Sequence, residues 1–484
     1  MKTSIKNIKS LAGILLVLVL LMSGIPVKAA LPIDQNFAQA TKCVLSDCNT
    51  ISLIAALPEI PASDDGILYV YELQPYEYAV SMQAVPIVSA PLSLTPAFSF
   101  SSKGPYGSRL YTKFVMAVKV GGQNVMISYP QYITNPELLA THTKPRKQRG
   151  KKSVQGEDFA NLFISSNLPG ILQGNFTTVQ VMNQGNNQTV TNPYARAAIV
   201  GADTHPVTPR YYMLNASDAA GIAAITSEVA SCAANSTAEN FIIGNEVNVR
   251  TWNYMIWTDW DSYIREYAQV FRVAYNAIKS QNANARVYVC MDQNWDRNRA
   301  VGHKEYYEYI DAKDFLIKFN AFIANEGNID WCLAQHPYTV PLTYSKFWDM
   351  SGCADGGYMA AQVSCGKMVT FQNLSVITNF MTTPQMLSPR GTVRNIILSE
   401  IGLTNAQGVA VQAAAICASY MAAKQNPYID EIIYLLAYSE PGIDTRLSGQ
   451  SQAVFNSLGT PNEAIYTEWA KAFIGITDWS QILK

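Results

Sequence analysis

The sequence predicts an α/β protein, a (β/α)8 TIM barrel preceded by a small β-rich, sandwich-like domain. From about residue 205 onward, short apolar runs of strand type alternate with amphipathic helical patterns. This alternation is typical of a parallel sheet whose strands are joined by helices. Earlier strand patterns are instead bounded by turn signals. We therefore expect a β-rich domain over residues 31–141 and a barrel over residues 153–484.

The length of the second region favours a closed barrel. Five consecutive strand–helix units follow one another in a segment of about 330 residues, which fits the usual size of such a barrel. The alternative is a doubly wound open sheet, which a glycine-rich phosphate-binding loop would support. The sequence contains no such loop.

Residues 1–30 are a targeting segment outside the fold. Lysines near the start are followed by the apolar run Leu11–Met22 and then by small residues. This is the pattern of a secretory signal peptide, cleaved after Ala29 or Ala30. The apolar run is short for a membrane span, which disfavours the alternative of an uncleaved anchor. We expect a secreted protein that has no membrane association after cleavage.

The composition argues against several classes of partner. Of the 484 residues, 49% are hydrophobic, and 35 basic residues face 36 acidic ones, for a net charge of −1. Such a balance gives no attraction to nucleic acid or to an anionic membrane. The basic run 142–152 is interpreted as a solvated linker, with nucleic-acid binding as the disfavoured alternative. No Cys or His pair has zinc-site spacing, so we expect no metal and no cofactor, and we expect a monomer.

The N-terminal region shows clear strand and turn signals. The turn signal Asp64–Gly66 precedes an alternating run at Ile67–Leu73. Tyr111–Val120 and Gln123–Tyr129 are separated by two glycines, which predicts a hairpin. These patterns predict a small β-sandwich packed on the barrel.

The start of the barrel region has a weaker pattern. Leu162–Ile164 is a candidate early barrel strand, and residues 179–190 are a candidate inserted hairpin. Tyr211–Asn215 is a clearer strand, followed by a helix over Ala216–Ala230.

The later strand–helix units are regular, with helical apolar residues at the 3.6-residue period and strands of continuous apolar character. After the strand that leads to Glu246, the expected elements are a helix at Tyr263–Lys279, a strand at Val287–Met291, a helix at Phe315–Ile323, a strand at Asp330–Gln335, a helix at Leu374–Phe380, a strand at Asn395–Glu400, a helix at Val409–Lys424, a strand at Glu431–Ala437 and a helix at Glu463–Phe473.

Two strand ends carry matched polar residues. The apolar run Phe241–Ile243 leads to Asn245 and Glu246, and the run Asn395–Ser399 ends at Glu400. Catalytic groups of a (β/α)8 barrel lie at the carboxyl ends of its strands. Hydrolysis of a glycosidic bond requires one carboxyl group that protonates the leaving oxygen and a second that attacks the anomeric carbon or activates water. The pair therefore predicts a secreted glycoside hydrolase acting on an extracellular carbohydrate.

Several neighbouring residues have two interpretations. A single glutamate at a strand end is often a salt-bridge partner, and a lone histidine such as His336 is more often structural than catalytic. Trp252 and Trp295 follow strand ends, and they either form walls of the cleft or pack in the core. Asp292 also ends a strand, without an obvious partner.

The eight cysteines do not all suggest disulfides. Two pairs close short loops, Cys43–Cys48 and Cys353–Cys365, and export permits their oxidation. Three of the remaining cysteines are interpreted as buried free thiols: Cys290, Cys332 and Cys417. Cys232 stays unassigned.

The strand-end glutamates resemble those of a known group of enzymes. Asn245 and Glu246 at one strand end and Glu400 at a later one resemble the (β/α)8 barrels of glycoside hydrolase clan A. The segments 243–248, 331–338 and 398–402 resemble, more specifically, an uncharacterised bacterial domain family of unknown function that is grouped with these hydrolases.

The resemblance to clan A implies roles for individual residues. Glu246 would be the general acid/base and Glu400 the nucleophile of a retaining reaction, with carboxyl oxygens roughly 5–5.5 Å apart. Asn245 would bind the sugar 2-hydroxyl, Tyr338 would hold Glu400, and His336 would lie near the nucleophile.

The sequence also departs from the clan pattern. The strand-three position, often His, is Asn215 here, and the strand-eight position, often Trp, is Tyr438 or a neighbour. The arginine that is common on strand two is not found. These departures bear on the identity of the substrate.

Two other functional hypotheses stay open. One is a catalytically inactive glycan-binding surface protein on the same barrel, against which the presence of both glutamates argues. The other is a structural surface protein, which only the β-rich N-terminal region supports.

Overall fold

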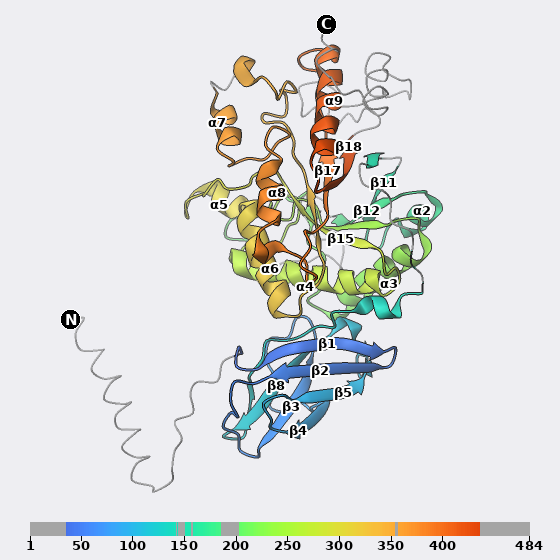
Figure 1. The fold of residues 1–484 in the computed structure, drawn as a ribbon, viewed down its shortest axis with the longest axis vertical. Helices are drawn as coiled ribbons and strands as arrows, with labels where there is room; N and C mark the ends of the chain where they lie inside the picture. Colours follow the sequence, from blue (N-terminus) through green and yellow to red (C-terminus); the bar gives the residue numbers. More distant parts are fainter. Residues whose placement is uncertain are drawn as a thin grey trace, which may run out of the picture.

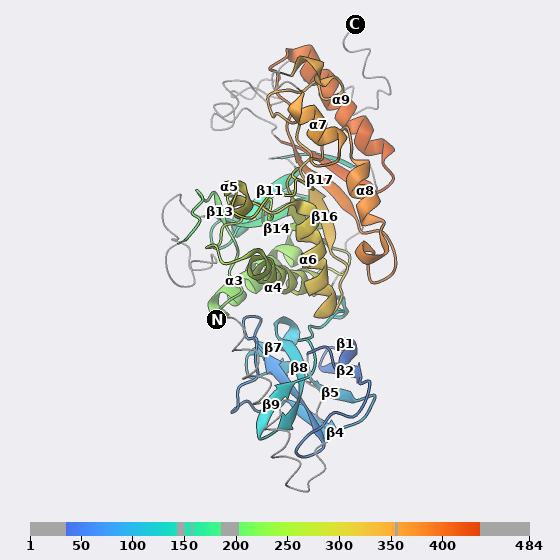
Figure 2. The same cartoon turned by 90° about the vertical axis from the view of Figure 1, so that its left-hand side faces the viewer.

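The computed structural model describes residues 35–141, 143, 151–155, 158–184, 203–353 and 357–435 (Figure 1). It consists of an antiparallel β-sandwich below a curled parallel sheet with helices around it, as Figures 1 and 2 show from two sides. The predicted signal peptide, the predicted helix at Glu463–Phe473 and Tyr438 lie outside the described residues.

Two antiparallel sheets form the N-terminal domain. One sheet has the order β1 (Gln39–Asp47), β2 (Thr50–Ala56), β5 (Ala97–Ser101), and the other has the order β4 (Val88–Pro91), β3 (Ile67–Leu73), β8 (Lys113–Val120), β9 (Gln123–Met126); β6 (Lys103–Gly104) and β7 (Gly107–Ser108) pair separately. Burial alternates along β2, as a strand with one face on a core requires. Buried residues of both sheets, such as Leu53 and Phe114, share one hydrophobic core. The bounds of β3, Ile67–Leu73, confirm the strand that the sequence predicted there.

The predicted glycine hairpin is present and is held by a side chain. Gly121 and Gly122, between β8 and β9, have φ angles of 58° and 74°. A two-residue hairpin turn requires such positive angles, which glycine adopts without strain. The Asp64 carboxylate accepts hydrogen bonds from both glycine amides, at 3.0 and 2.8 Å.

The sandwich packs against α4 and the end of α6. Asn276 on α4 (Trp260–Lys279) donates to the Leu110 carbonyl at 2.8 Å, and Gln131 donates to the Asn325 carbonyl at 2.7 Å. The Tyr132 amide donates to the carbonyl of Glu326, just beyond α6 (Ala312–Asn325). These contacts join the two domains on the side of the parallel sheet where its strands begin.

The second domain is built on one parallel sheet. Its neighbours follow the order β10 (Lys151–Val154), β18 (Ile429–Tyr434), β17 (Ile396–Ile401), β16 (Cys332–Gln335), β15 (Arg286–Met291), β14 (Asn240–Ile243), β12 (Thr178–Gln184), β11 (Phe159–Phe163), and all these pairs are parallel. Within the described residues, β10 and β11 share only an isolated bridge between Gln155 and Phe159. The sheet is therefore curled, and no continuous ladder closes it into the predicted barrel.

A buried polar network inside the curl links distant strands. Glu431 on β18 accepts from Ser153 on β10 at 2.6 Å and from Asn240 on β14 at 2.9 Å. Because β18 and β14 are four places apart in the sheet order, only a strongly curled sheet brings these side chains together.

Helices surround the parallel sheet, namely α2 (Leu168–Gln173), α3 (Ala219–Asn235), α4, α6, α8 (Ser375–Met381) and α9 (Val409–Gln425). The short helices α5 (Lys304–Glu308) and α7 (Tyr358–Ser364) belong to the segments that follow β15 and β16. Asp218 and Asp259 cap α3 and α4 by accepting a backbone amide hydrogen in the first turn, at 2.7 and 2.8 Å. Among the described helices, none combines the length and the apolar character that crossing a bilayer requires.

Three sequence-based assignments in the second domain are wrong. Of the candidate hairpin at residues 179–190, residues 179–184 belong to the parallel strand β12, and residues 185–190 lie outside the described residues. Only Tyr211 and Tyr212 form a strand, β13, which runs antiparallel to β12 and is not a strand of the parallel series. The basic run ends inside the fold, because β10 begins at Lys151. Short or interrupted apolar runs gave these segments no period that a sequence pattern could detect.

The two predicted disulfides are absent from the structure. All four cysteines concerned are free thiols, with Cys43 and Cys353 buried and Cys48 and Cys365 exposed. Cys43 lies on β1 and points into the sandwich core, where burial raises its pKa to about 12. Short spacing therefore did not imply pairing here, because the strand turns one cysteine of the pair inward.

Candidate active site

The backbone after β14 turns sharply to present Glu246. Gly244 has a φ of 79°, and Glu246 itself has a φ of 38°, which is rare for a residue with a side chain. A Cβ on Gly244 would lie 2.7 Å from the Val247 side chain, so the turn requires glycine. Gln180 on β12 holds the turn by donating to the Gly244 carbonyl at 3.0 Å and to Asn245 Oδ1 at 2.8 Å.

His336 contacts Glu246 directly. Its Nδ1 lies 3.0 Å from Glu246 Oε1, and its Nε2 lies 3.2 Å from the Cys290 sulfur. His336 directly follows β16, Cys290 is the last residue but one of the neighbouring strand β15, and both are fully enclosed. The imidazole is thus fixed from both sides, and one side faces the carboxyl group.

Tyr338 contacts the second glutamate. The Tyr338 hydroxyl donates to Glu400 Oε1 at 2.6 Å. Glu400 lies in β17 where the pairing with β18 changes register between Leu398 and Ile401. An irregularity of this kind changes the direction in which a side chain points, and it is common next to active sites.

The two glutamates are near enough to influence each other. Burial, followed by the nearby charges of Asp292 and Glu400, raises the pKa of Glu246 to about 6, although His336 opposes this shift. Burial alone would lower the pKa of His336, but the Cys290 sulfur, the charge of Glu400 and the hydrogen bond to Glu246 raise it well above its usual value. One carboxyl group of the pair therefore holds its proton into the mildly acidic range.

A third carboxyl group, on Asp292, lies at the same end of the sheet. Asn248 donates to Asp292 Oδ1 at 2.7 Å, and the Asn294 side chain also donates to the carboxylate. Burial raises the pKa of Asp292 in spite of these hydrogen bonds. The sequence indicated a position at the strand end but no partner. The sequence pattern did not identify the hydrogen-bond partners of Asp292, which are Asn248 and Asn294, although each of them follows a strand end.

The structure also places Cys290 in the site, although the sequence pattern indicates only a buried thiol at this position. It is buried as expected, but its sulfur contacts His336. No signal in the sequence identifies this contact, because it depends on the pairing of β15 with β16.

The two tryptophans have different positions. Trp252 is half-buried in the loop after β14, where its ring lies 5.9 Å from that of Tyr211. Trp295 is 3% exposed and packs edge-on against Phe380 in the hydrophobic core. The interpretation of Trp295 as a cleft wall therefore does not fit its position, and the ring has a packing role.

Asn215 is used by the local backbone. Its amide donates to Asp218 at 2.6 Å, and its oxygen accepts from the Ser217 amide at 2.9 Å. These bonds form the turn that starts α3, next to the short antiparallel β13. The strand-three position that the clan pattern assigns to Asn215 therefore does not correspond to its place in this sheet, in which β12 is the third parallel strand along the chain.

In the described part of the chain, no group of three or more His, Cys, Asp or Glu side chains is arranged to hold a metal ion. The residues that the structure does bring together are Glu246, His336, Tyr338 and Glu400, with Asn245 and Asp292 beside them.

The comparison with solved structures finds weak likeness to bacterial β-glucuronidases. They include one from Ruminococcus gnavus in complex with uronic deoxynojirimycin (8% identity, TM-score 0.34), one from Faecalibacterium prausnitzii (11%, 0.33) and a calcium-binding mutant of Bacteroides uniformis β-glucuronidase 2 (10%, 0.36). The matches cover 90%, 91% and 90% of this chain, and 67%, 66% and 49% of those chains. At such TM-scores the likeness carries no argument about activity.

No curated protein matches the chain. A family match covers most of the second domain. Residues 172–482 match a family of unknown function, DUF5722. This range includes Glu246, His336, Tyr338 and Glu400, and it leaves out the N-terminal sandwich. Because the match spans well over half of the sequence, the chain belongs to the family of unknown function DUF5722.

Proposed function

We propose that the protein is a secreted, retaining glycoside hydrolase that cleaves an extracellular poly- or oligosaccharide. The observation that carries this proposal is the pairing of two carboxyl groups through one short segment. His336 contacts Glu246. Tyr338, which lies two residues further along the chain, contacts Glu400. The parallel order of the strands, with all these residues at or after strand ends, also supports a (β/α)8 barrel as the underlying fold.

The environments of the two glutamates support different roles. The raised pKa of Glu246 suits a general acid, which must hold a proton until it donates that proton to the glycosidic oxygen. Glu400 accepts a hydrogen bond from the Tyr338 hydroxyl at 2.6 Å, which fixes the position of its carboxyl group. A carboxyl group held in this way is positioned to attack the anomeric carbon.

In the first step, the bond between the anomeric carbon and the glycosidic oxygen breaks, Glu246 gives its proton to that oxygen, and a Glu400 oxygen forms an ester bond to the anomeric carbon. In the second step, Glu246 takes a proton from water, the water oxygen bonds to the anomeric carbon, and the ester to Glu400 breaks. Asn245, held by Gln180, would bind the sugar 2-hydroxyl, and the half-buried Trp252 would contact a sugar face.

The decisive experiment is an assay of the purified protein on aryl glycosides and on plant, fungal and bacterial glycans, with detection of new reducing ends. We expect hydrolysis of at least one substrate. Binding of a glycan without turnover would instead support the inactive glycan-binding alternative.

Stereochemistry tests the mechanism separately. Proton NMR of the first-formed product should show the anomer of the substrate, because two displacements at the anomeric carbon restore its configuration. The opposite anomer would replace the retaining mechanism with an inverting one.

A further inference from the structure

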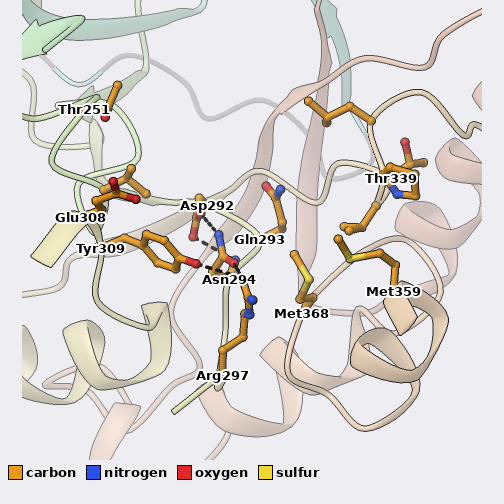
Figure 3. A pocket seen from close by; sticks show the side chains of 14 residues that line it. Thr251, Asp292, Gln293, Asn294, Arg297, Glu308, Tyr309, Thr339, Met359 and Met368 are labelled. Atoms are coloured by element: carbon orange, nitrogen blue, oxygen red, sulfur yellow. Dashed lines mark hydrogen bonds between the residues drawn. The ribbon is translucent and has the colours of Figure 1, made fainter. Parts of the chain in front are cut away.

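A pocket of about 410 Å³ lies between the segments that follow β14, β15 and β16 (Figure 3). Two observations place it near Glu246, which does not itself line it. Asp292 lines the pocket and helps to raise the pKa of Glu246, and the amide of Val249, another lining residue, donates to the Glu246 carbonyl at 2.7 Å. The volume lies in the range of roughly 300–1,000 Å³ that is typical of small-molecule sites.

The pocket has two unlike walls. Figure 3 shows Asp292, Asn294, Arg297 and Tyr309 on one side, and the methionines 359 and 368 on the other, with Gln293 between them. Methionine packs adaptably against irregular apolar surfaces. The pocket therefore suits a ligand that has both an apolar face and a polar edge.

The charged side chains of the pocket are already paired. Arg297 donates to the Tyr309 hydroxyl at 2.9 Å and lies 3.6 Å from Glu305. Glu308 pairs with Lys304 at 2.9 Å. The lining has one basic side chain against two acidic ones, Asp292 and Glu308, so it gives no net attraction to an anionic ligand.

Three neutral side chains keep hydrogen-bonding capacity for a ligand. Within the described part of the chain, the side chains of Gln293, Thr251 and Thr339 make no hydrogen bond, and all three line the pocket. An amide and a hydroxyl can each donate and accept, as the hydroxyl groups of a sugar do. The unused capacity thus matches a neutral polyhydroxylated ligand.

We propose that this pocket is the subsite for the leaving group, and that it takes a neutral sugar residue. The inference rests on the proposed function, because the group that protonates the glycosidic oxygen must lie on the side of the leaving group. Gln293 and Thr251 bind hydroxyl groups of that sugar, and the methionines contact its C–H face. The enzyme therefore cleaves between two sugar residues.

The test compares two substrates that share a glycone. One is a neutral oligosaccharide cleaved by the wild-type protein, and the other is the 4-nitrophenyl glycoside of the same glycone, whose leaving group makes no sugar contacts. We expect Gln293→Leu and Thr251→Val each to lower kcat/KM on the oligosaccharide by ~10-fold or more, since a site built to bind a hydroxyl discriminates strongly when that bond is lost. The aryl glycoside should change by no more than about 2-fold.

The matched control is Gln385→Leu, at an exposed position in the short helical turn Pro384–Met386. It should leave kcat/KM unchanged on both substrates. Equal losses on both substrates, or no loss on the oligosaccharide, would overturn the leaving-group assignment while the proposed function stands.

If the proposed function itself is wrong, the wild-type protein hydrolyses neither substrate. In that event, saturation-transfer NMR with a neutral and a uronic-acid trisaccharide decides the ligand class. Weaker binding of the neutral sugar by Gln293→Leu supports the pocket as a neutral-sugar site. If the wild-type protein and Gln293→Leu bind the neutral trisaccharide equally, or if the wild-type protein prefers the uronic-acid trisaccharide, the assignment of a neutral-sugar site is overturned.

Discussion

The two ends of the parallel sheet use buried carboxyl groups in opposite ways. At the end where the strands begin, Glu431 is held by Ser153 and Asn240, neutral side chains that do not change charge near neutral pH. At the other end, His336 contacts Glu246 and Tyr338 contacts Glu400, and the charge of Glu400 also raises the pKa of Glu246. The comparison teaches that the type of partner, and not burial by itself, separates a structural carboxyl group from one suited to proton transfer.

The sharpest test of this comparison replaces each glutamate of the pair. We expect Glu246→Gln and Glu400→Gln to lower kcat by ~10³-fold or more on an identified substrate, because neither amide can transfer a proton or form the glycosyl ester. Circular dichroism and thermal unfolding should show a folded protein. Near-normal activity of either variant would remove that residue from the proposed mechanism.

Loss of the Tyr338 hydroxyl should have a smaller effect. Tyr338→Phe removes the 2.6 Å hydrogen bond to Glu400. A hydrogen bond to a charged group contributes about 1.5–3 kcal/mol, so kcat/KM should fall by roughly 10- to 100-fold. The readout is steady-state kinetics on the same substrate. The idea that Tyr338 holds the nucleophile would be abandoned if the variant kept wild-type kinetics.

At the opposite end of the sheet the effect should fall on stability. Glu431→Gln places an amide where Ser153 and Asn240 both donate, and a buried donor left without an acceptor costs about 1–3 kcal/mol. Urea unfolding should show this loss, while kcat of the folded protein stays normal. Glu59→Gln, at an exposed position, serves as the control. A reduced kcat with unchanged stability would contradict the contrast between the two ends.

The smallest expected effect is a shift of the pH profile. Glu246 acts as an acid only while it is protonated, so kcat/KM should fall as the pH rises through its pKa of about 6. The negative charge of Asp292 helps to raise that pKa. Asp292→Asn removes the charge, so the pKa falls and the decline in activity begins at a lower pH. A profile that stays unchanged, or moves to higher pH, would exclude this influence of Asp292.

Much of the second domain could be predicted because its elements are long and regular. The helix expected at Tyr263–Lys279 is α4 (Trp260–Lys279), and the strand expected at Val287–Met291 is β15 (Arg286–Met291). The positions of Glu246 and Glu400 after apolar strand runs followed from the same patterns. Local periodicity reports which face of an element is buried, and that is enough to place a residue at a strand end.

Other features depended on contacts between distant segments. Residues 179–184 looked like part of a hairpin, but β12 pairs in parallel with β11 and β14. Trp295 and Trp252 occupy similar sequence positions after strands, yet one ring is enclosed by the core and the other is half-buried in a loop. Burial of such a ring is decided by the helix that packs against it, and a single sequence does not specify that helix.

The sequence by itself determined the alternation of strands and helices, the two glutamates at strand ends and the glycine turn of the sandwich, because each depends on local periodicity or on the backbone freedom of glycine. Only the tertiary structure decided that His336 lies between Cys290 and Glu246 and that Tyr338 reaches Glu400. It also decided that the cysteines predicted to form disulfides remain free thiols. These contacts join residues up to 90 positions apart, so strand pairing and the curl of the sheet set them.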